Sequence, residues 1–427
     1  MIRVTEQLHF FQGNDPVRLA QEYGTPVYVY NERILRERCR EMKGLVDYPG
    51  FRVNYSAKAN SNPALLQIVR QEGLDVDAMS PGEIQAELLA GFDPSQILYI
   101  SNNVSREEMQ FAIDRGICVS VDSLSQLDQY GQINPGGRVA IRFNPGVGAG
   151  HHDKVVTGGK KTKFGVNAEY IPDVKAILAK YNLRLVGIDQ HIGSLFMDGA
   201  QYIEGASNLL TIARQFEGLE FIDLGGGFGI PYYKEDGEPR LDLAGLGRRL
   251  TEYINHFVRE YGRELLVKIE PGRYIAAECG VLLGGIHAVK YNGEDKYIGT
   301  DIGMNVLARP VLYDSYHGIE VYAKDGGSLE QEQEIATIVG NICESGDILA
   351  KGRMLPKGKP GDIIGVLDAG AYGSVMSGNY NNRLRAAEIL IREDNSVRLI
   401  RRRDTLEDIM RPYEGLLQRE WETPTMM

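Results

Sequence analysis

The sequence is poor in cysteine, and no two cysteines stand close together. Among 427 residues there are 4 cysteines, at Cys39, Cys118, Cys279 and Cys343. Zinc ribbons and CxxC redox sites need two cysteines within a few residues, so this spacing excludes both. Sparse, separated thiols suit a reducing compartment and offer no disulfide framework. We therefore expect a cytoplasmic protein that depends on a hydrophobic core.

Long apolar runs and an excess of basic residues are also missing. No stretch approaches the ~20 apolar residues of a spanning helix, and the N-terminus lacks the charge and apolar order of a signal peptide. The formal net charge of −11 argues against nucleic acid or an anionic membrane as a partner. Acidic residues follow the basic cluster 401–403, which we interpret as a solvated strand end.

Short β-branched or apolar runs alternate with helical patterns from residue 51 onward. Eight such runs can be counted, at 51–56, 75–79, 97–101, 118–122, 139–144, 185–191, 221–225 and 265–270. The stretches between them repeat apolar residues at intervals of three and four, with glycine near the end of each helical pattern. Eight βα units predict a closed (β/α)8 TIM barrel, whose usual length is ~250 residues. An open, doubly wound sheet is the alternative.

The pattern changes after residue 270. Short strands separated by Gly, Asp and Pro turns replace the helical patterns, which predicts a second, mostly β domain. The fold class is therefore α/β, with a (β/α)8 barrel at 28–276 and a C-terminal β domain at 277–427. The N-terminal segment 1–27 is not a barrel unit, so we expect it to join the β domain by adding a strand.

Residues with catalytic chemistry fall at the C-terminal ends of the predicted barrel strands, where such barrels build their active sites. They are Lys58, His191, the glycines 225–227 and Glu270. A lysine at a strand end is usually a solvated surface residue. If the lysine were instead enclosed in the mouth of the barrel, the opening at the C-terminal ends of its strands, burial would lower its pKa. The neutral amine could then form a Schiff base. The small residues around Lys58 leave room for a cofactor.

The other strand ends each allow a structural interpretation too. The stretch DLGGGFGIP at 223–231 does not have GxGxxG spacing and no helix follows, so it forms either a tight turn or a seat for a single phosphate. His191 is either a hydrogen-bonded core residue or a site residue. The adjacent His151 and His152 lack a carboxylate or cysteine at ligand spacing, so we expect a polar loop and no metal site.

Two further stretches hold reactive side chains. In EPGR, Glu270 and Arg273 could simply pair, or the carboxylate could hold a proton on a heterocyclic nitrogen while the arginine binds a substrate carboxylate. In NICESGD, Cys343 stands beside Glu344. A buried cysteine is most often a small hydrophobic residue, yet one in a polar cleft can donate a proton.

Seven ordered motifs resemble those of the fold-type III pyridoxal-phosphate decarboxylases. They are YSAKAN, HIGS, DLGGGFGIPY, EPGRY, ARPVLYDSYHG, CESGD and GAYGSVMSGNYN. The likeness is greatest to the diaminopimelate decarboxylases and covers nearly the whole chain. It implies an alanine racemase-like barrel with a β domain, pyridoxal 5'-phosphate as cofactor, and a homodimer with shared active sites.

The resemblance also implies a role for each matching residue. Lys58 matches the lysine that holds the cofactor, His191 the histidine that stacks on its ring, and Glu270 the partner of its pyridine nitrogen. The remaining cofactor positions are Ser194, Gly226, Gly227, Gly272, Arg273 and Tyr372, with Gly227 and the EPGR backbone at the phosphate. The substrate positions are Arg273, Arg309, Tyr313, Glu344 and Tyr372. Cys343 matches the proposed proton donor, which comes with Glu344 from the partner subunit.

The charges of the substrate positions bear on the substrate. The far end of meso-diaminopimelate is an amino-acid group, which needs cations for its carboxylate and an anion for its ammonium; Arg273, Arg309 and Glu344 supply both. This predicts decarboxylation to L-lysine and CO2, the last step of lysine biosynthesis. The alternatives are a decarboxylase of another diamino acid, such as D-ornithine, D-lysine, ornithine, arginine or carboxynorspermidine, and a non-catalytic pyridoxal-phosphate-binding protein.

Overall fold

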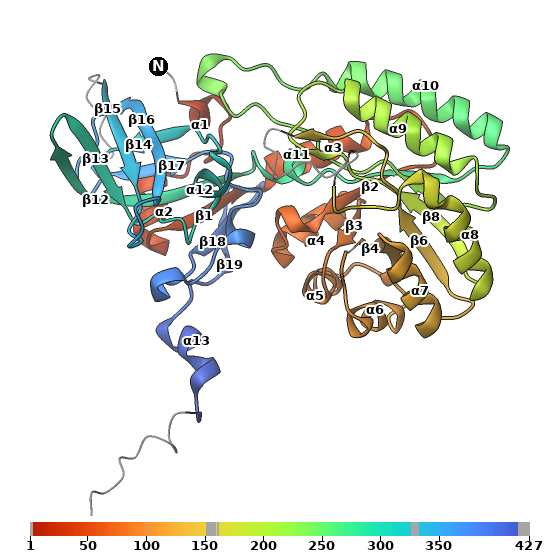
Figure 1. The fold of residues 1–427 in the computed structure, drawn as a ribbon. Helices are drawn as coiled ribbons and strands as arrows, with labels where there is room; N and C mark the ends of the chain where they lie inside the picture. Colours follow the sequence, from red (N-terminus) through yellow and green to blue (C-terminus); the bar gives the residue numbers. More distant parts are fainter. Residues whose placement is uncertain (1–2, 101, 151–158, 160–161, 326–332, 417–427) are drawn as a thin grey trace, which may run out of the picture. The chain divides into compact units, whose positions relative to one another are not determined.

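The computed structural model describes residues 3–100, 102–150, 159, 162–325 and 333–416 (Figure 1). The chain divides into two compact units. The barrel unit comprises Met1–Phe10, Asn31–Gly280 and Asp368–Val375. The β unit comprises Phe11–Tyr30, Val281–Leu367 and Met376–Met427. The N-terminal segment thus contributes to both units, and the domain boundaries expected after residues 27 and 276 stay predictions.

The barrel unit confirms the predicted fold class. Within its described residues, eight parallel strands close in the order β10-β11-β2-β3-β4-β5-β6-β8. They are β2 (Phe51–Ser56), β3 (Asp75–Ala78), β4 (Ile97–Ile100), β5 (Cys118–Val121), β6 (Arg138–Arg142), β8 (Arg184–Asp189), β10 (Phe221–Asp223) and β11 (Leu266–Ile269). Each lies within or next to a run that the sequence pattern predicts. Because the sheet closes, the open doubly wound alternative is wrong.

A helix precedes the first barrel strand, and helices connect the successive strands that follow (Figure 1). The main ones are α3 (Glu32–Lys43), α4 (Pro63–Gln71), α5 (Pro81–Leu89), α6 (Arg106–Ile113), α7 (Leu124–Ile133), α8 (Ile171–Lys180), α9 (Ala200–Ala213) and α10 (Leu243–Tyr261). The short helices are α1 (Val4–Gln7) and α11 (Arg273–Ala276), and β7 (Ala149–Gly150) pairs with β9 (Gly193–Ser194). No helix in the described part of the chain is long and apolar enough to cross a membrane.

Capping residues fix where the helices begin. The side chain of Asn62 accepts the Ala64 N–H at 3.0 Å, and that of Ser80 accepts the Glu83 N–H at 3.2 Å. A proline occupies the first turn of both α4 and α5, where its missing N–H costs no helical hydrogen bond. These caps terminate the loops that leave the C-terminal ends of β2 and β3, and so limit how those loops can move.

The β unit is built on a mixed sheet. In its described residues the nine-stranded sheet follows the path β16-β15-β13-β12-β1-β18-β19, with β17 pairing β12 and β14. Its strands are β1 (Val27–Asn31), β12 (Gly280–Asn292), β13 (Asp295–Thr300), β14 (Ile319–Tyr322), β15 (Gln333–Val339), β16 (Ile348–Pro356), β17 (Ile363–Val366), β18 (Ala387–Ile391) and β19 (Val397–Arg401). Its helices are α2 (Pro16–Tyr23), α12 (Arg309–Tyr313) and α13 (Leu406–Met410).

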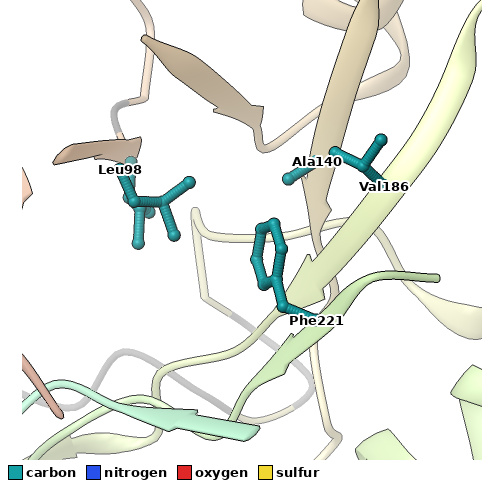
Figure 2. Close-up of a cluster of buried hydrophobic side chains, with 5 residues drawn as sticks. Leu98, Ala140, Val186 and Phe221 are labelled. Atoms are coloured by element: carbon teal, nitrogen blue, oxygen red, sulfur yellow. The ribbon is translucent and has the colours of Figure 1, made fainter. Parts of the chain in front are cut away.

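A cluster of buried apolar side chains joins four of the barrel strands. Figure 2 shows the Phe221 ring of β10 between Leu98 of β4 and Ala140 of β6, with Val186 of β8 beside it. The neighbouring Gly187 is paired with Phe221 across β8 and β10. A Cβ at Gly187 would lie 2.1 Å from Cζ of Phe221, so the glycine provides the room that the ring fills.

This contact predicts the effect of enlarging Gly187. We expect Gly187→Ala to lower the free energy of unfolding by about 1–3 kcal/mol, because overpacking displaces the Phe221 ring and its neighbours. Urea unfolding followed by circular dichroism measures the change. Gly378→Ala is the matched control, since no atom lies within 4 Å of a Cβ placed there. Equal stability of the two variants would contradict the packing argument.

Candidate active site

The predicted strand-end residues lie on four neighbouring strands. Lys58 is in the turn η1 (Ala57–Ala59) after β2, and His191 follows β8. The glycines 225–227 follow β10, and Glu270 comes directly after β11. These strands are consecutive in the closed barrel, in the order β8-β10-β11-β2. Because all are parallel, their C-terminal ends meet at one mouth.

The His191 imidazole is neutral in this mouth. Its Nδ1 lies 3.5 Å from Oε2 of Glu270, which would be an ion pair only if the ring were protonated. The backbone N–H of Gly226 donates to the same Nδ1 at 3.2 Å, so Nδ1 carries a lone pair and no proton. Burial, followed by the positive charges of Lys58 and Arg142, holds the pKa of His191 well below its ordinary value.

The carboxyl of Glu270 is buried, with 3% of the residue exposed. Burial first, and then the negative charges of Asp223 and Asp77, raise its pKa well above the ordinary value. Its Oε1 has no hydrogen-bond partner among the residues that the structure describes. A buried oxygen of this kind needs a donor, and the protonated nitrogen of a heterocyclic cofactor is a suitable one.

The electrostatics of Lys58 differ from the sequence-based expectation. Burial does lower the pKa of its ammonium, but neighbouring groups act in the opposite direction, the carboxylate of Asp77 most strongly, and the net shift is upward. The carboxylate of Asp77 is held in place by the Ser56 hydroxyl at 3.0 Å and the Ala57 N–H at 3.2 Å. The expectation that Lys58 loses its proton readily by burial alone was therefore wrong for the chain without cofactor.

The glycines of the mouth allow backbone segments to pack directly against one another. A Cβ at Gly226 would lie 1.9 Å from the carbonyl oxygen of Glu270, and one at Gly225 would lie 2.2 Å from that of Gln190. Gly227 also has φ +111°, which side chains rarely allow. Gly272 would bring its Cβ 2.9 Å from that of Ala59. A side chain at any of these positions would collide with the neighbouring backbone or with Ala59, and the strand ends would have to move apart.

Arg273, the first residue of α11, contacts both Ser194 and Tyr372. Its Nη2 donates to Oγ of Ser194 at 3.0 Å and its Nη1 to the hydroxyl of Tyr232 at 2.8 Å. Its guanidinium carbon lies 4.8 Å from the centre of the Tyr372 ring, a cation–π distance. No ion pair joins Arg273 to Glu270 in the described residues, so the simple pairing of these two side chains is wrong.

The remaining predicted substrate residues belong to the β unit. Arg309 is 1% exposed, and its Nη1 lies 2.8 Å from Nε2 of His317. The other ring nitrogen, Nδ1, lies 2.7 Å from the Leu367 carbonyl. Since a carbonyl only accepts, Nδ1 carries the proton and Nε2 accepts from Arg309. Tyr313 ends α12.

Cys343 and Glu344 are exposed on the β unit. The Cys343 backbone N–H donates to Oδ1 of Asn381 at 2.7 Å, which ties the CESGD turn to the segment that contains Asn381. An exposed thiol does not act as a buried hydrophobic residue, so that interpretation of Cys343 is wrong. Its role as a proton donor stays a prediction.

Sequence reasoning missed several charged residues of the site. Arg142 ends β6, is buried, and lies with its guanidinium carbon 4.7 Å from the centre of the Phe164 ring. Asp77 and Asp223 are buried in β3 and β10. The same rule that selected Lys58 would have found them, because each polar residue interrupts or ends an apolar strand near its C-terminus.

The described residues contain no group of three or more His, Cys, Asp or Glu side chains that could hold a metal ion. The pair His151–His152, which we expect to be a polar loop, lies outside the described residues. The donor set of the mouth instead fits a pyridoxal group. It combines an amine at Lys58, a buried acceptor at Glu270, a neutral imidazole at His191 and a guanidinium at Arg273.

Comparison with known proteins agrees with this chemistry. Residues 32–277 match the family described as "Pyridoxal-dependent decarboxylase, pyridoxal binding domain". The chain is 42% identical over 420 residues to the diaminopimelate decarboxylase of Methanothermobacter thermautotrophicus, covering 96% of each chain. It is 36% identical over 413 residues to that of Escherichia coli K12, covering 92% of this chain and 95% of the relative.

Solved structures give the same result. The diaminopimelate decarboxylase of Helicobacter pylori complexed with L-lysine superimposes with a TM-score of 0.86 at 31% identity, over 94% of this chain and 100% of that one. The enzyme of M. jannaschii in complex with L-lysine gives a TM-score of 0.82 at 32% identity, over 93% and 94% of the two chains. This chain therefore belongs to the diaminopimelate decarboxylase family of the pyridoxal-dependent decarboxylases.

Proposed function

We propose that this protein decarboxylates meso-diaminopimelate to L-lysine and CO2 with pyridoxal 5'-phosphate, as the last step of lysine biosynthesis. The observation that carries the proposal is the buried Oε1 of Glu270, which lacks a partner among the described residues in a mouth that also holds Lys58. The relatives named diaminopimelate decarboxylase support the substrate, because they match almost the whole chain.

Different residues of the mouth would bind different parts of the cofactor. Lys58 would hold it through Nζ, and Oε1 of Glu270 would accept the N–H of the protonated ring. The neutral imidazole of His191 adds no positive charge beside that ring. The hydroxyl of Ser194, the guanidinium of Arg273 and the backbone at Gly226, Gly227 and Gly272 are proposed for the phosphate. When bound, pyridoxal phosphate provides an electron sink for the charge left at Cα after CO2 departs.

The remaining residues would bind the substrate and move a proton. The proposed substrate groups are Arg273, Arg309, Tyr313, Glu344 and Tyr372. His317 fixes the guanidinium of Arg309 through Nε2, so the arginine is oriented before any substrate arrives. The exposed thiol of Cys343 would deliver a proton to Cα, and Glu344 would bind the distal ammonium of the substrate.

We also propose that the protein works as a homodimer with shared active sites, in which one subunit provides Lys58 and the other Cys343 and Glu344. The exposure of Cys343 and Glu344 supports this arrangement. A further support is the apolar surface of the β unit near its C-terminus, where Leu406 is 64% and Met410 43% exposed. Exposed apolar side chains that lie close together mark interaction surfaces.

A second candidate is the decarboxylation of another diamino acid. The lysine/ornithine decarboxylase of Vibrio vulnificus has a TM-score of 0.76 but only 19% identity, so it shares the fold alone. Two arginines at the substrate positions would be idle or repulsive for a substrate whose far end is only an ammonium. A non-catalytic cofactor-binding protein is disfavoured because both Lys58 and Cys343 are present.

The substrate assay tests the proposed activity. Protein supplied with pyridoxal phosphate should release L-lysine and CO2 from meso-diaminopimelate faster than it decarboxylates D-ornithine, D-lysine or carboxynorspermidine. Lys58→Ala should lose turnover and the absorbance of covalently held cofactor. Lys180→Ala should keep both, since Lys180 ends α8 before the N-terminal end of β8 and its exposed ammonium pairs with Asp128 on α7 at 2.8 Å. Absence of turnover with meso-diaminopimelate in the unaltered protein would refute the proposal.

Proton donation by Cys343 predicts a selective loss. Cys343→Ala should lower kcat about a hundredfold or more while cofactor affinity stays unchanged, because a positioned acid contributes about 10²–10⁴-fold. Steady-state kinetics and titration of the apoprotein with pyridoxal phosphate measure the two quantities. Cys118→Ala, in β5, is the control and should keep kcat. A Cys343→Ala variant with normal kcat would remove the thiol from the mechanism.

Shared active sites predict complementation between inactive variants. An equimolar, exchanged mixture of Lys58→Ala and Cys343→Ala should recover about one quarter of full activity, because half of the dimers are mixed and each mixed dimer has one intact site. Native mass spectrometry confirms the exchange. If mixed dimers form and no activity returns, each site is built from one subunit.

A further inference from the structure

One buried carboxylate outside the proposed site forms ion pairs with basic side chains from separate segments of the barrel unit. Glu278 lies just after α11, and its side chain is 1% exposed. Arg240 donates to both of its oxygens, at 2.8 and 2.7 Å. Nε of Arg38, on α3, lies 3.0 Å from Oε2, and Nζ of Lys234 lies 3.3 Å from Oε1. These charges hold the pKa of Glu278 at about 2, although burial acts in the opposite direction.

Two of these cations belong to the loop between β10 and α10. Lys234 begins the turn η5 (Lys234–Asp236), and Arg240 comes shortly before α10. The same loop contains Tyr232, whose backbone N–H donates to Oε2 of Glu238 at 2.7 Å. The hydroxyl of Tyr232 accepts the Nη1 hydrogen of Arg273 at 2.8 Å. Glu278 therefore holds the loop that provides one partner of Arg273.

The second partner of Arg273 is connected to the same carboxylate. Lys234 also forms an ion pair with the buried Asp368, which begins the segment Asp368–Val375 of the barrel unit. That segment contains Tyr372, whose ring receives the guanidinium of Arg273 at 4.8 Å. The backbone N–H of Tyr372 donates to the carbonyl of Ala59, the residue after Lys58, at 2.8 Å.

We propose that Glu278 is a positioning residue that orients Arg273 through Tyr232 and Tyr372, by way of Lys234. The inference deepens the proposed function and rests on it, because it assumes that Arg273 binds cofactor or substrate. Without the carboxylate, the mostly buried Lys234 keeps only Asp368 as its counterion, and the partly exposed Arg240 loses both of its acceptors on Glu278. The loop between β10 and α10 then loses the contacts that hold it and shifts. The two aromatic partners of Arg273 then shift with it.

The first test measures cofactor affinity, so it does not depend on turnover. Glu278→Gln keeps the size of the side chain and removes its charge. The Kd of the apoprotein for pyridoxal phosphate, followed by fluorescence, should rise about tenfold or more, because small displacements of positioning groups have effects of this size. KM for meso-diaminopimelate should rise more than kcat falls. Glu278→Asp, which keeps the charge, should recover most of the affinity.

Glu72 is the matched control for the loss of a buried ion pair. Its side chain is 9% exposed, and it binds Nη1 of Arg36 and Nε of Arg40, each at 2.8 Å. It lies between the end of α4 and the start of β3, at the opposite end of the barrel from the mouth. Glu72→Gln should lower the melting temperature as Glu278→Gln does, but leave the Kd for pyridoxal phosphate unchanged. Equal Kd changes in both variants would overturn the proposal.

A double-mutant cycle tests the route through the loop. Tyr232→Phe removes only the hydroxyl that accepts from Arg273. If Glu278 acts through this contact, the changes in the logarithm of Kd from Glu278→Gln and Tyr232→Phe will not add, and the double variant will resemble the weaker-binding single variant. Full additivity would overturn the proposed route. A wild-type protein that binds pyridoxal phosphate but has no decarboxylase activity would refute the proposed function and leave this test intact.

Discussion

Closure of the parallel barrel is the constraint on which the active site depends. Pairing of β10 with β8 and β11, and of β11 with β2, aligns four strand ends that are far apart in the sequence. Lys58 and Glu270 are 212 positions apart in the numbering, yet they follow adjacent strands. The Phe221 ring and Gly187 support this alignment from inside the barrel, because they fill the space where β8 and β10 meet.

The mouth concentrates charges of both signs in a place with little water. Asp77, Asp223 and Glu270 are buried together, and burial raises the pKa of each carboxyl. Lys58 and Arg142 provide the compensating positive charge. Such an arrangement holds exchangeable protons near neutral pH, as acid–base chemistry on a bound cofactor requires.

Much of the barrel could be predicted because its signals are local. Strand runs, helical spacing and capping residues such as Ser80 act within a few residues, and the rule for strand ends then identifies Lys58, His191 and Glu270. The upward pKa shift of Lys58 could not be predicted, since it depends on Asp77 from another strand. Likewise, the bond that fixes Arg309 on His317 and the cations around Glu278 are tertiary contacts that no spacing in the sequence reveals.

The glycines after β10 have a consequence for the thermodynamics of cofactor binding. At Gly225 and Gly226 the backbone packs directly against the backbone of Gln190 and Glu270, which leaves these two positions little freedom to rearrange. Their shape is set when the barrel folds. The loss of conformational entropy that accompanies an induced pocket is thus largely incurred before the ligand arrives, and more of the interaction free energy remains available as affinity.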